Sequence, residues 1–232
     1  MKTIKSTMLW LTLFGIAMGF LETSVVIYLR KIYYPDGFRF PLVEIGNDIL
    51  LVEILREFAT MIMLLSIGLL IGKTKLQRFA FFIFSFAVWD IFYYIFLKIL
   101  IDWPESFLTP DILFLIPVPW VGPVMTPIIL SISMIVLSFI ILRHEESQKS
   151  NSLLRRDWVL LISGSLIAII SFLINFIKTL EEMMMSSVFG NKMSIEIIEP
   201  NFSYLNWTVF GIGECLIVYA IIGIMKKKPL IA

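Results

Sequence analysis

Ionisable and phenolic side chains interrupt the long apolar stretches of this sequence, and several of them follow helical spacing. Glu53, Arg56 and Glu57 would share one face of a helix, because residues three and four positions apart do so. Ionisable groups within an apolar span are costly, and they usually face a cavity or the interior of a helix bundle. Carboxyl groups in that setting can bind a proton, a metal ion or a cationic solute. The residues predicted to form such a substrate- or ion-binding site are Glu22, Glu53, Arg56, Glu57, Asp90, Tyr93, Tyr94 and Glu214.

The candidate residues are unbalanced in charge, because most of them are acids and only Arg56 is basic. This imbalance predicts either that burial protonates some of the carboxyl groups or that a cation lies among them. A structural alternative also fits: Glu53, Arg56 and Glu57 would then pair between helices and only stabilise their packing. Glu22, Asp90 and Glu214 favour a functional site, since isolated acids within spans usually mark one.

Motifs that identify common enzymes and nucleotide-binding proteins are absent from the sequence. There is no G-x-S-x-G, H-E-x-x-H, Walker A or G-x-G-x-x-G pattern, so no catalytic residue is assigned. The single His144 and single Cys215 argue against a haem or zinc site and exclude an intrachain disulfide. We predict no cofactor. A divalent cation held by carboxylate oxygens is a candidate ligand, with no metal ligands assigned.

The elements that must position these residues are membrane-spanning helices. Of the 232 residues 59% are apolar and only 16% are charged, and the mean hydropathy is +0.91. Ordinary soluble domains are about 45–50% apolar and about 25% charged. A net charge of +1 gives no basic surplus for binding nucleic acid. The chain is therefore predicted to be a polytopic protein whose main partner is the lipid bilayer.

Six segments are long and apolar enough to span a bilayer, which takes about 20 residues. We predict an all-α bundle of six transmembrane helices that forms a single domain over residues 1–232. The fourth segment contains several prolines, and its first part, Ile112 to Pro123, is predicted to be a short re-entrant or interfacial piece. The predicted spans are 8–29, 49–72, 79–99, 112–142, 157–178 and 204–225.

The loops between the predicted spans differ in charge. Lys and Arg are concentrated at both ends of the chain and in the loops after the second and fourth spans. Because basic loops remain on the cytoplasmic side, both termini are predicted to be cytoplasmic. The protein is accordingly expected to be a multi-pass protein of the plasma (inner) membrane.

Two stretches of the sequence share one pattern, which predicts an internal repeat. The pattern is an acid, five residues, aromatic-Leu-basic, then aromatic-Pro-acid-small-Phe-x-x-Pro and finally Asp-Ile-Leu. The copies begin at Glu22 and Asp90, and Asp48 and Asp111 begin their last parts as predicted helix N-caps. Because both copies start in helices that run the same way, the two-helix units 8–72 and 79–142 would form a parallel repeat. Helices five and six, 157–225, fit the pattern only weakly.

The segment from Leu115 to Pro123 has too many prolines for a regular helix. Irregular backbone at membrane depth is tolerated where it lies inside protein or beside a water-filled cavity. One interpretation is a broken helix that lines a site, and the other is an interfacial turn anchored by Trp120. One side of the fifth span carries Gly164, Ser171, Asn175 and Lys178. The predicted cavity-lining residues are Pro117, Pro119, Trp120 and Asn175.

Three motifs within residues 20–130 resemble an uncharacterised family of prokaryotic multi-spanning membrane proteins. They are Trp89-Asp90-x-x-Tyr93-Tyr94, Trp103-Pro104-Glu105-Ser106 and Pro117-Val118-Pro119-Trp120-Val121-Gly122-Pro123. The resemblance implies a polytopic membrane protein and no particular activity.

Three functions fit these observations. The first is a small transporter or ion-handling protein, in which Glu22, Asp90 and Glu214 bind a proton, a metal ion or a small cationic solute. At this size it would work as a homo-oligomer. The second is a membrane enzyme acting on a lipid or lipid-linked substrate at the outer leaflet. Glu57 and Asp90 would then act as acid and base or bind a divalent metal, and Arg30 or Lys98 would hold a phosphate. The third is a non-catalytic assembly subunit.

Overall fold

Six long helices and one short hairpin make up the fold. The computed structural model describes residues 2–39, 43, 45–147, 153–188 and 202–227. All six helices contain a segment long and apolar enough to cross a membrane, which confirms the predicted six-span all-α bundle. The elements are α1 (Lys2–Tyr33), α2 (Asn47–Ile71), α3 (Lys75–Ile101), β1 (Pro110–Phe114), β2 (Trp120–Pro123), α4 (Met125–Glu146), α5 (Arg155–Val188) and α6 (Tyr204–Met225).

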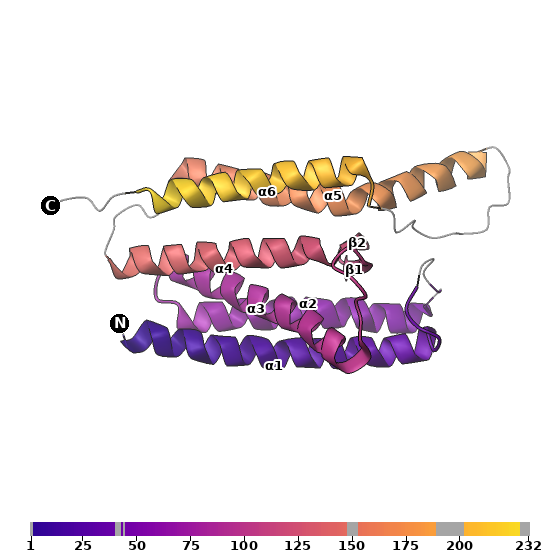
Figure 1. Cartoon of the computed structure of the whole chain (residues 1–232), viewed down its shortest axis with the longest axis horizontal. Helices are drawn as coiled ribbons and strands as arrows, with labels where there is room; N and C mark the ends of the chain where they lie inside the picture. The colour runs from indigo at the N-terminus through magenta and orange to yellow at the C-terminus, as the bar shows by residue number, and fades with distance from the viewer. Residues whose placement is uncertain (1, 40–42, 44, 148–152, 189–201, 228–232) are drawn as a thin grey trace.

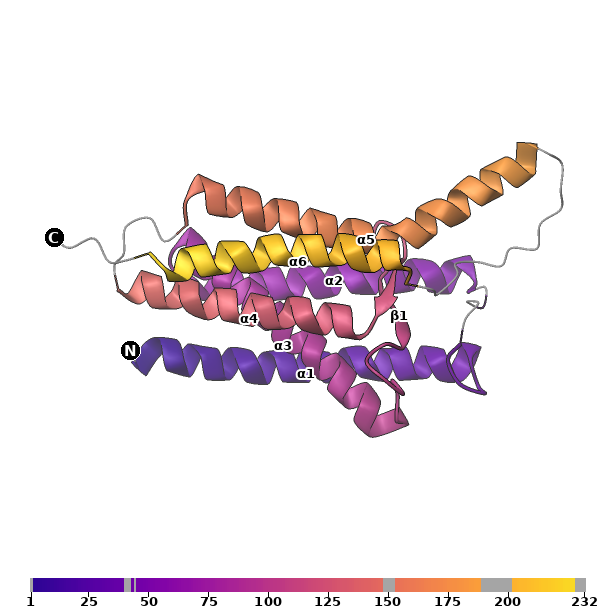
Figure 2. The same cartoon turned by 45° about the horizontal axis from the view of Figure 1, so that its top comes forward.

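The central element of the bundle is α3, which packs against α1, α2 and α4. On the other side of the molecule α5 pairs with α6, and this pair meets the rest of the protein at α4 and β2 (Figures 1 and 2). By contrast, α1 and α2 have little direct backbone contact with each other. The first turn of α1 and the last turn of α6 lie at the same end of the bundle (Figure 1).

Small residues determine which face of α1 meets α3. A Cβ atom on Gly15 would lie 2.8 Å from the Val88 side chain, and one on Gly19 would lie 2.9 Å from the Trp89 carbonyl oxygen. Both contacts are too close for any other residue to fit without movement, so the two helices approach closely only through these glycines. Glu22 lies on the same side of α1, so this packing turns its side chain toward the inside of the bundle.

The ends of the helices are capped mostly by local hydrogen bonds. Thr74 caps α3 by accepting a hydrogen bond from the Gln77 backbone N–H at 3.1 Å, and Ser203 begins α6 in a capping box with Asn206. The prediction of Asp48 as an N-cap was wrong, because Gly46 precedes α2 and its first turn contains Asp48. Asp48 still lies where the positive end of the helix dipole favours an acid.

The proline-rich segment is a β-hairpin and not the start of a span. The strands β1 and β2 are antiparallel, with Asp111 opposite Gly122 and Ile112 opposite Val121, and α4 begins only at Met125. Within the predicted segment 112–142 the spanning helix is thus only the part from Met125, and the part before it, predicted as a separate short piece, is a hairpin. Asp111 is a strand residue and not a helix N-cap. The physical reason is that prolines prevent a continuous helix, while a hairpin satisfies much of the backbone hydrogen bonding within itself.

The predicted internal repeat is not confirmed by the fold. Its last element, Asp-Ile-Leu, lies in the first turns of α2 in one copy and in β1 in the other. The first helix of each copy thus runs in the same direction. The next element along the chain is a helix in one copy and a strand in the other. The parallel repeat of two-helix units remains a prediction.

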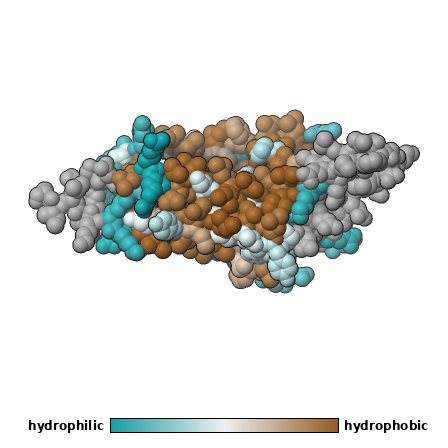
Figure 3. Space-filling model, turned by 90° about the horizontal axis from the view of Figure 1, so that it is seen from above, coloured by the Kyte–Doolittle hydropathy of each residue, from teal (hydrophilic) through white to brown (hydrophobic). Residues whose placement is uncertain are grey.

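The surface of the bundle suits a bilayer. Figure 3 shows hydrophobic residues across the middle of the molecule and hydrophilic residues toward both ends. Large apolar side chains are exposed on every spanning helix, among them Leu70 on α2 and Ile99 on α3. In water this exposure would be costly, but hydrocarbon chains can cover it.

The close packing of α5 and α6 can be tested with two glycines on the same helix. A Cβ atom on Gly213 would lie 2.7 Å from the Gly164 carbonyl oxygen, whereas one on Gly211 would meet nothing within 4 Å. We expect Gly213→Ala to lower the free energy of unfolding by about 1–3 kcal/mol, because the two backbones must separate. Thermal unfolding of the purified protein in detergent measures this effect.

The matched control is Gly211→Ala. We expect it to leave the melting temperature unchanged or slightly raised, since alanine favours a helix by up to about 1 kcal/mol relative to glycine. Equal effects of the two substitutions would contradict the described packing of α5 on α6.

Candidate functional site

A cavity of about 370 Å³ lies between α1 and α2. It forms where these helices separate, with α3 behind it and β1 beside it. Residues from the second half of α1, the first half of α2 and the second half of α3 line it, so it lies in the half of the bundle away from the termini. This is the half that the basic loops predict to be the outer one.

The cavity brings together most of the residues that helical spacing singled out. Seven of the eight predicted binding residues line it, and so does Pro119 from the predicted cavity-lining set. Its walls are otherwise largely aromatic and aliphatic, as in many small-molecule sites. The predicted residues that line the cavity are Glu22, Glu53, Arg56, Glu57, Asp90, Tyr93, Tyr94 and Pro119.

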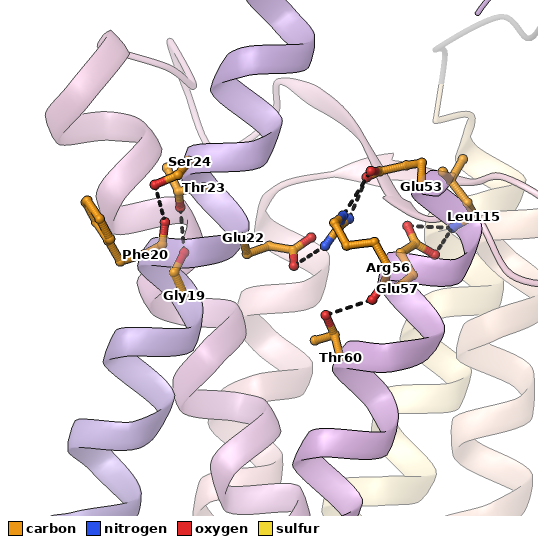
Figure 4. Close-up of polar contacts among 10 residues, drawn as sticks. All are labelled: Gly19, Phe20, Glu22, Thr23, Ser24, Glu53, Arg56, Glu57, Thr60 and Leu115. Carbon is orange, nitrogen blue, oxygen red and sulfur yellow. Dashed lines mark hydrogen bonds and ion pairs between the residues drawn. The ribbon is translucent and has the colours of Figure 1, made fainter. Parts of the chain in front are cut away.

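Arg56 of α2 connects the two helices on either side of the cavity (Figure 4). Its guanidinium group forms an ion pair with Glu22 of α1, and it donates to both carboxylate oxygens of Glu53 at 2.5 and 2.9 Å. The Arg56 side chain is 20% exposed, and the Glu22 and Glu53 side chains are each 11% exposed. One cation therefore compensates two largely buried carboxylates, one on its own helix and one on α1.

A second guanidinium group, that of Arg30, lies near the end of α1. Its Nη2 atom is 3.1 Å from Oδ1 of Asp111, whose other oxygen accepts a hydrogen bond from the Tyr94 hydroxyl at 3.2 Å. The guanidinium carbon lies 3.7 Å from the Trp103 ring centroid and 4.4 Å from that of Phe38. Burial raises the pKa of Asp111, and the nearby Arg30 and Tyr94 act in the opposite direction.

Glu57 and Asp90 have no basic partner among the residues that the structure describes. Both carboxylate oxygens of Glu57 accept the Leu115 backbone N–H, at 2.9 and 3.2 Å. One oxygen of Asp90 accepts the Ser131 hydroxyl at 2.8 Å. Two guanidinium groups thus compensate three of the five carboxyl groups that line the cavity, and these two remain.

Glu214 and three predicted cavity-lining residues lie outside this cavity. Glu214 of α6 accepts a hydrogen bond from Ser133 of α4, so it belongs to the contact between those helices. The Trp120 ring stacks on Phe172, with centroids 6.3 Å apart, and Asn175 accepts a hydrogen bond from Asn206 at 3.4 Å. Pro117 is exposed in the turn of the hairpin. Because β2 packs against α5, Trp120 lies on the side of the hairpin that faces α5.

Arg30 and Asp111 are cavity residues that the sequence did not place in the binding site. Arg30 was considered only as a phosphate ligand of the enzyme hypothesis, and Asp111 only as a helix cap. Their one sequence signal is the shared pattern, in which Arg30 occupies the basic position and Asp111 begins the Asp-Ile-Leu element. Helical periodicity cannot pair them, because 81 positions separate them and one lies in a strand.

Metal binding has little support in the part of the chain that the structure describes. No group of three or more His, Cys, Asp or Glu side chains there is arranged to hold a metal ion. A divalent cation in the cavity would therefore need several ligands from water or from a bound substrate. The divalent cation remains a prediction.

In comparisons with known proteins, no protein-family model, no curated protein sequence and no solved structure matches the chain.

The connection between α1 and α2 can be tested by removing its cation. We expect Arg56→Met to lower the free energy of unfolding by about 3 kcal/mol or more, because Glu22 and Glu53 would remain buried without a partner. The melting temperature of the purified protein in detergent reports this loss.

A triple variant separates the cost of unpaired charge from the loss of packing. Adding Glu22→Gln and Glu53→Gln to Arg56→Met removes the unpaired carboxylates, and we expect it to restore most of the lost stability. If the triple variant is as unstable as Arg56→Met, the ion pairs do not explain the effect.

Proposed function

We propose that the protein binds a small cation in the cavity between α1 and α2 and transports or otherwise handles it. The cation would be a proton, a metal ion or a small cationic solute. The observation that carries this proposal is that Glu57 and Asp90 line the cavity wall with no ion-pair partner among the residues that the structure describes.

Electrostatics favours a cation over other ligands. A carboxylate removed from water is costly unless a positive charge compensates it or a proton neutralises it. Arg56 and Arg30 pair with Glu22, Glu53 and Asp111, and among the described residues neither forms an ion pair with Glu57 or Asp90. A bound cation or a bound proton would compensate these two carboxyl groups at close range.

The aromatic walls favour an organic cation. Tyr93 and Tyr94 of α3 and Trp89 one turn before Tyr93 line the cavity together with Asp90. Aromatic rings attract cations over their faces, and an apolar wall accommodates the hydrocarbon part of a solute. A small amine would use both the carboxyl groups and the rings.

The interpretation that the buried charges only stabilise helix packing applies to some of them. Glu22, Glu53 and Arg56 form an ion-paired group between α1 and α2, and we assign them a supporting role. Glu57 and Asp90 are assigned to the ligand. A bundle of six spans is small for alternating access, so we propose that the protein works as a homo-oligomer.

The proposal is tested with purified protein in liposomes. Uptake is measured for protons with a trapped pH dye, for Mn²⁺ with a trapped metal-sensitive dye and for labelled ethanolamine as a small amine. We expect at least one of these to enter faster than into empty liposomes. Asp90→Asn and Glu57→Gln should each slow that entry about 10-fold or more, a change equivalent to about 1.4 kcal/mol.

Glu214→Gln is the matched control, because Glu214 also bonds to a serine of α4 but lies outside the cavity. We expect its uptake rate to equal that of the wild type. The proposal fails if no probe enters, or if Glu214→Gln slows uptake as much as Asp90→Asn does.

Orientation in the membrane is a separate prediction, since the cavity should open on the outer side of the plasma membrane. In a Cys215→Ser background we introduce Ser106→Cys, between α3 and β1, or Ser147→Cys, after α4. Both serines are exposed. A membrane-impermeant maleimide should label the first variant in intact cells and the second only after permeabilisation. The reverse pattern would place the termini outside.

A further inference from the structure

We propose that the ligand of this cavity is a zwitterion, with its ammonium group at Asp90 and Glu57 and its anionic oxygen group at Arg30. This inference rests on the proposed cation site and adds a second binding group at the other side of the same cavity. The shared chemistry is that of a free zwitterionic solute or of a zwitterionic lipid headgroup.

The first observation is an unused donor on a buried arginine. Arg30 is 9% exposed and lines the cavity, yet its Nη1 atom has no hydrogen-bond partner in the described part of the chain. A guanidinium group carries five N–H donors and no acceptor, and a buried donor without a partner is costly. An oxygen of a ligand would complete its hydrogen bonding.

The second observation is that Arg30 is held in place. Asp111 holds Nη2, and the rings of Trp103 and Phe38 lie over the guanidinium group at 3.7 and 4.4 Å. A planar guanidinium group fixed in this way is preorganised for a carboxylate or phosphate, because its paired donors match their oxygen atoms. Asp111 compensates the charge of Arg30 but contacts it only at Nη2, so the Nη1 donor is not used by this ion pair.

The third observation concerns where the two ends of the ligand would lie. Tyr94 follows Asp90 by one helical turn, about 5.4 Å along α3, and its hydroxyl group reaches the carboxylate that holds Arg30. The route from Asp90 to Arg30 therefore runs along one wall of a single cavity. A short molecule with opposite charges at its two ends fits this arrangement.

The charge of the cavity excludes a simple anion as its ligand. Five carboxyl groups line the walls against two guanidinium groups, so a free phosphate would be repelled. A simple cation would compensate Asp90 and Glu57 but would leave the donor of Arg30 without an acceptor. A zwitterion satisfies both.

The experiment compares one zwitterion with its two halves. Equilibrium dialysis on the purified full-length protein measures the binding of glycerophosphoethanolamine, of ethanolamine and of dimethyl phosphate. We expect the wild type to bind the zwitterion about 10-fold or more tightly than ethanolamine, and to bind dimethyl phosphate weakest.

Two kinds of variant test the binding of the two ends of the ligand separately. Arg30→Lys retains the charge beside Asp111 but loses the second donor group, and it should weaken zwitterion binding about 10-fold while leaving ethanolamine binding unchanged. Asp90→Asn should weaken the binding of both.

If Arg30→Lys folds poorly, Arg30→Gln with Asp111→Asn removes the buried pair as a unit and should give the same selective loss. Lys98→Gln, which changes an exposed cation paired with Asp102, is the control and should bind like the wild type.

The outcomes distinguish this inference from the proposed function. Equal binding of ethanolamine and the zwitterion, with no effect of Arg30→Lys, would overturn the inference and leave the cation site. Binding of neither amine would overturn both.

A last arm of the experiment identifies the source of the zwitterion. The protein is placed in nanodiscs of phosphatidylglycerol, with or without phosphatidylethanolamine. Weaker binding of glycerophosphoethanolamine when phosphatidylethanolamine is present supports a lipid headgroup as the ligand. Unchanged binding supports a free solute.

Discussion

The ion pairing of Arg56 with Glu22 and Glu53 is the interaction on which the site depends. Because α1 and α2 both pack on α3 and barely meet each other, only side chains can close the space between them. In a low-dielectric environment, charged groups can do so only if they are paired. The pairing therefore holds the two helices at a separation that leaves a cavity, and it compensates charge that would otherwise make the cavity unstable.

The two arginines of the cavity have different positions and different consequences. Arg56 pairs with two carboxylates deep in the bundle, so its guanidinium group serves to join α1 to α2. Arg30 pairs with one carboxylate near the end of α1, between two aromatic rings, and retains a free donor. The same residue type thus serves as a support in one place and as a binding group in the other, because the number of acceptors around it differs.

Much of the architecture follows from apolar length and helical periodicity, and the exceptions have local causes. Spans are recognisable because each must bury its own backbone hydrogen bonds in lipid, and the spacing of Glu53, Arg56 and Glu57 places them on one face. The piece before α4 is a hairpin, which the sequence did not reveal because apolar composition does not separate strands from a short helical segment. Glu214 lies outside the cavity of the other acids, and the sequence could not show this because depth in the membrane does not tell which neighbouring helix a side chain faces.

By itself, the sequence determined that this chain has six apolar helices that can span a membrane and that acids interrupt several of these spans. Both properties depend on residue type and on distances of a few positions. Only the tertiary structure decided which acids share a cavity, which have a basic partner and that Arg30 meets Asp111 across 81 positions. The physical reason is that charge compensation depends on distance in space. That distance is set by how α1, α2 and the hairpin pack around α3.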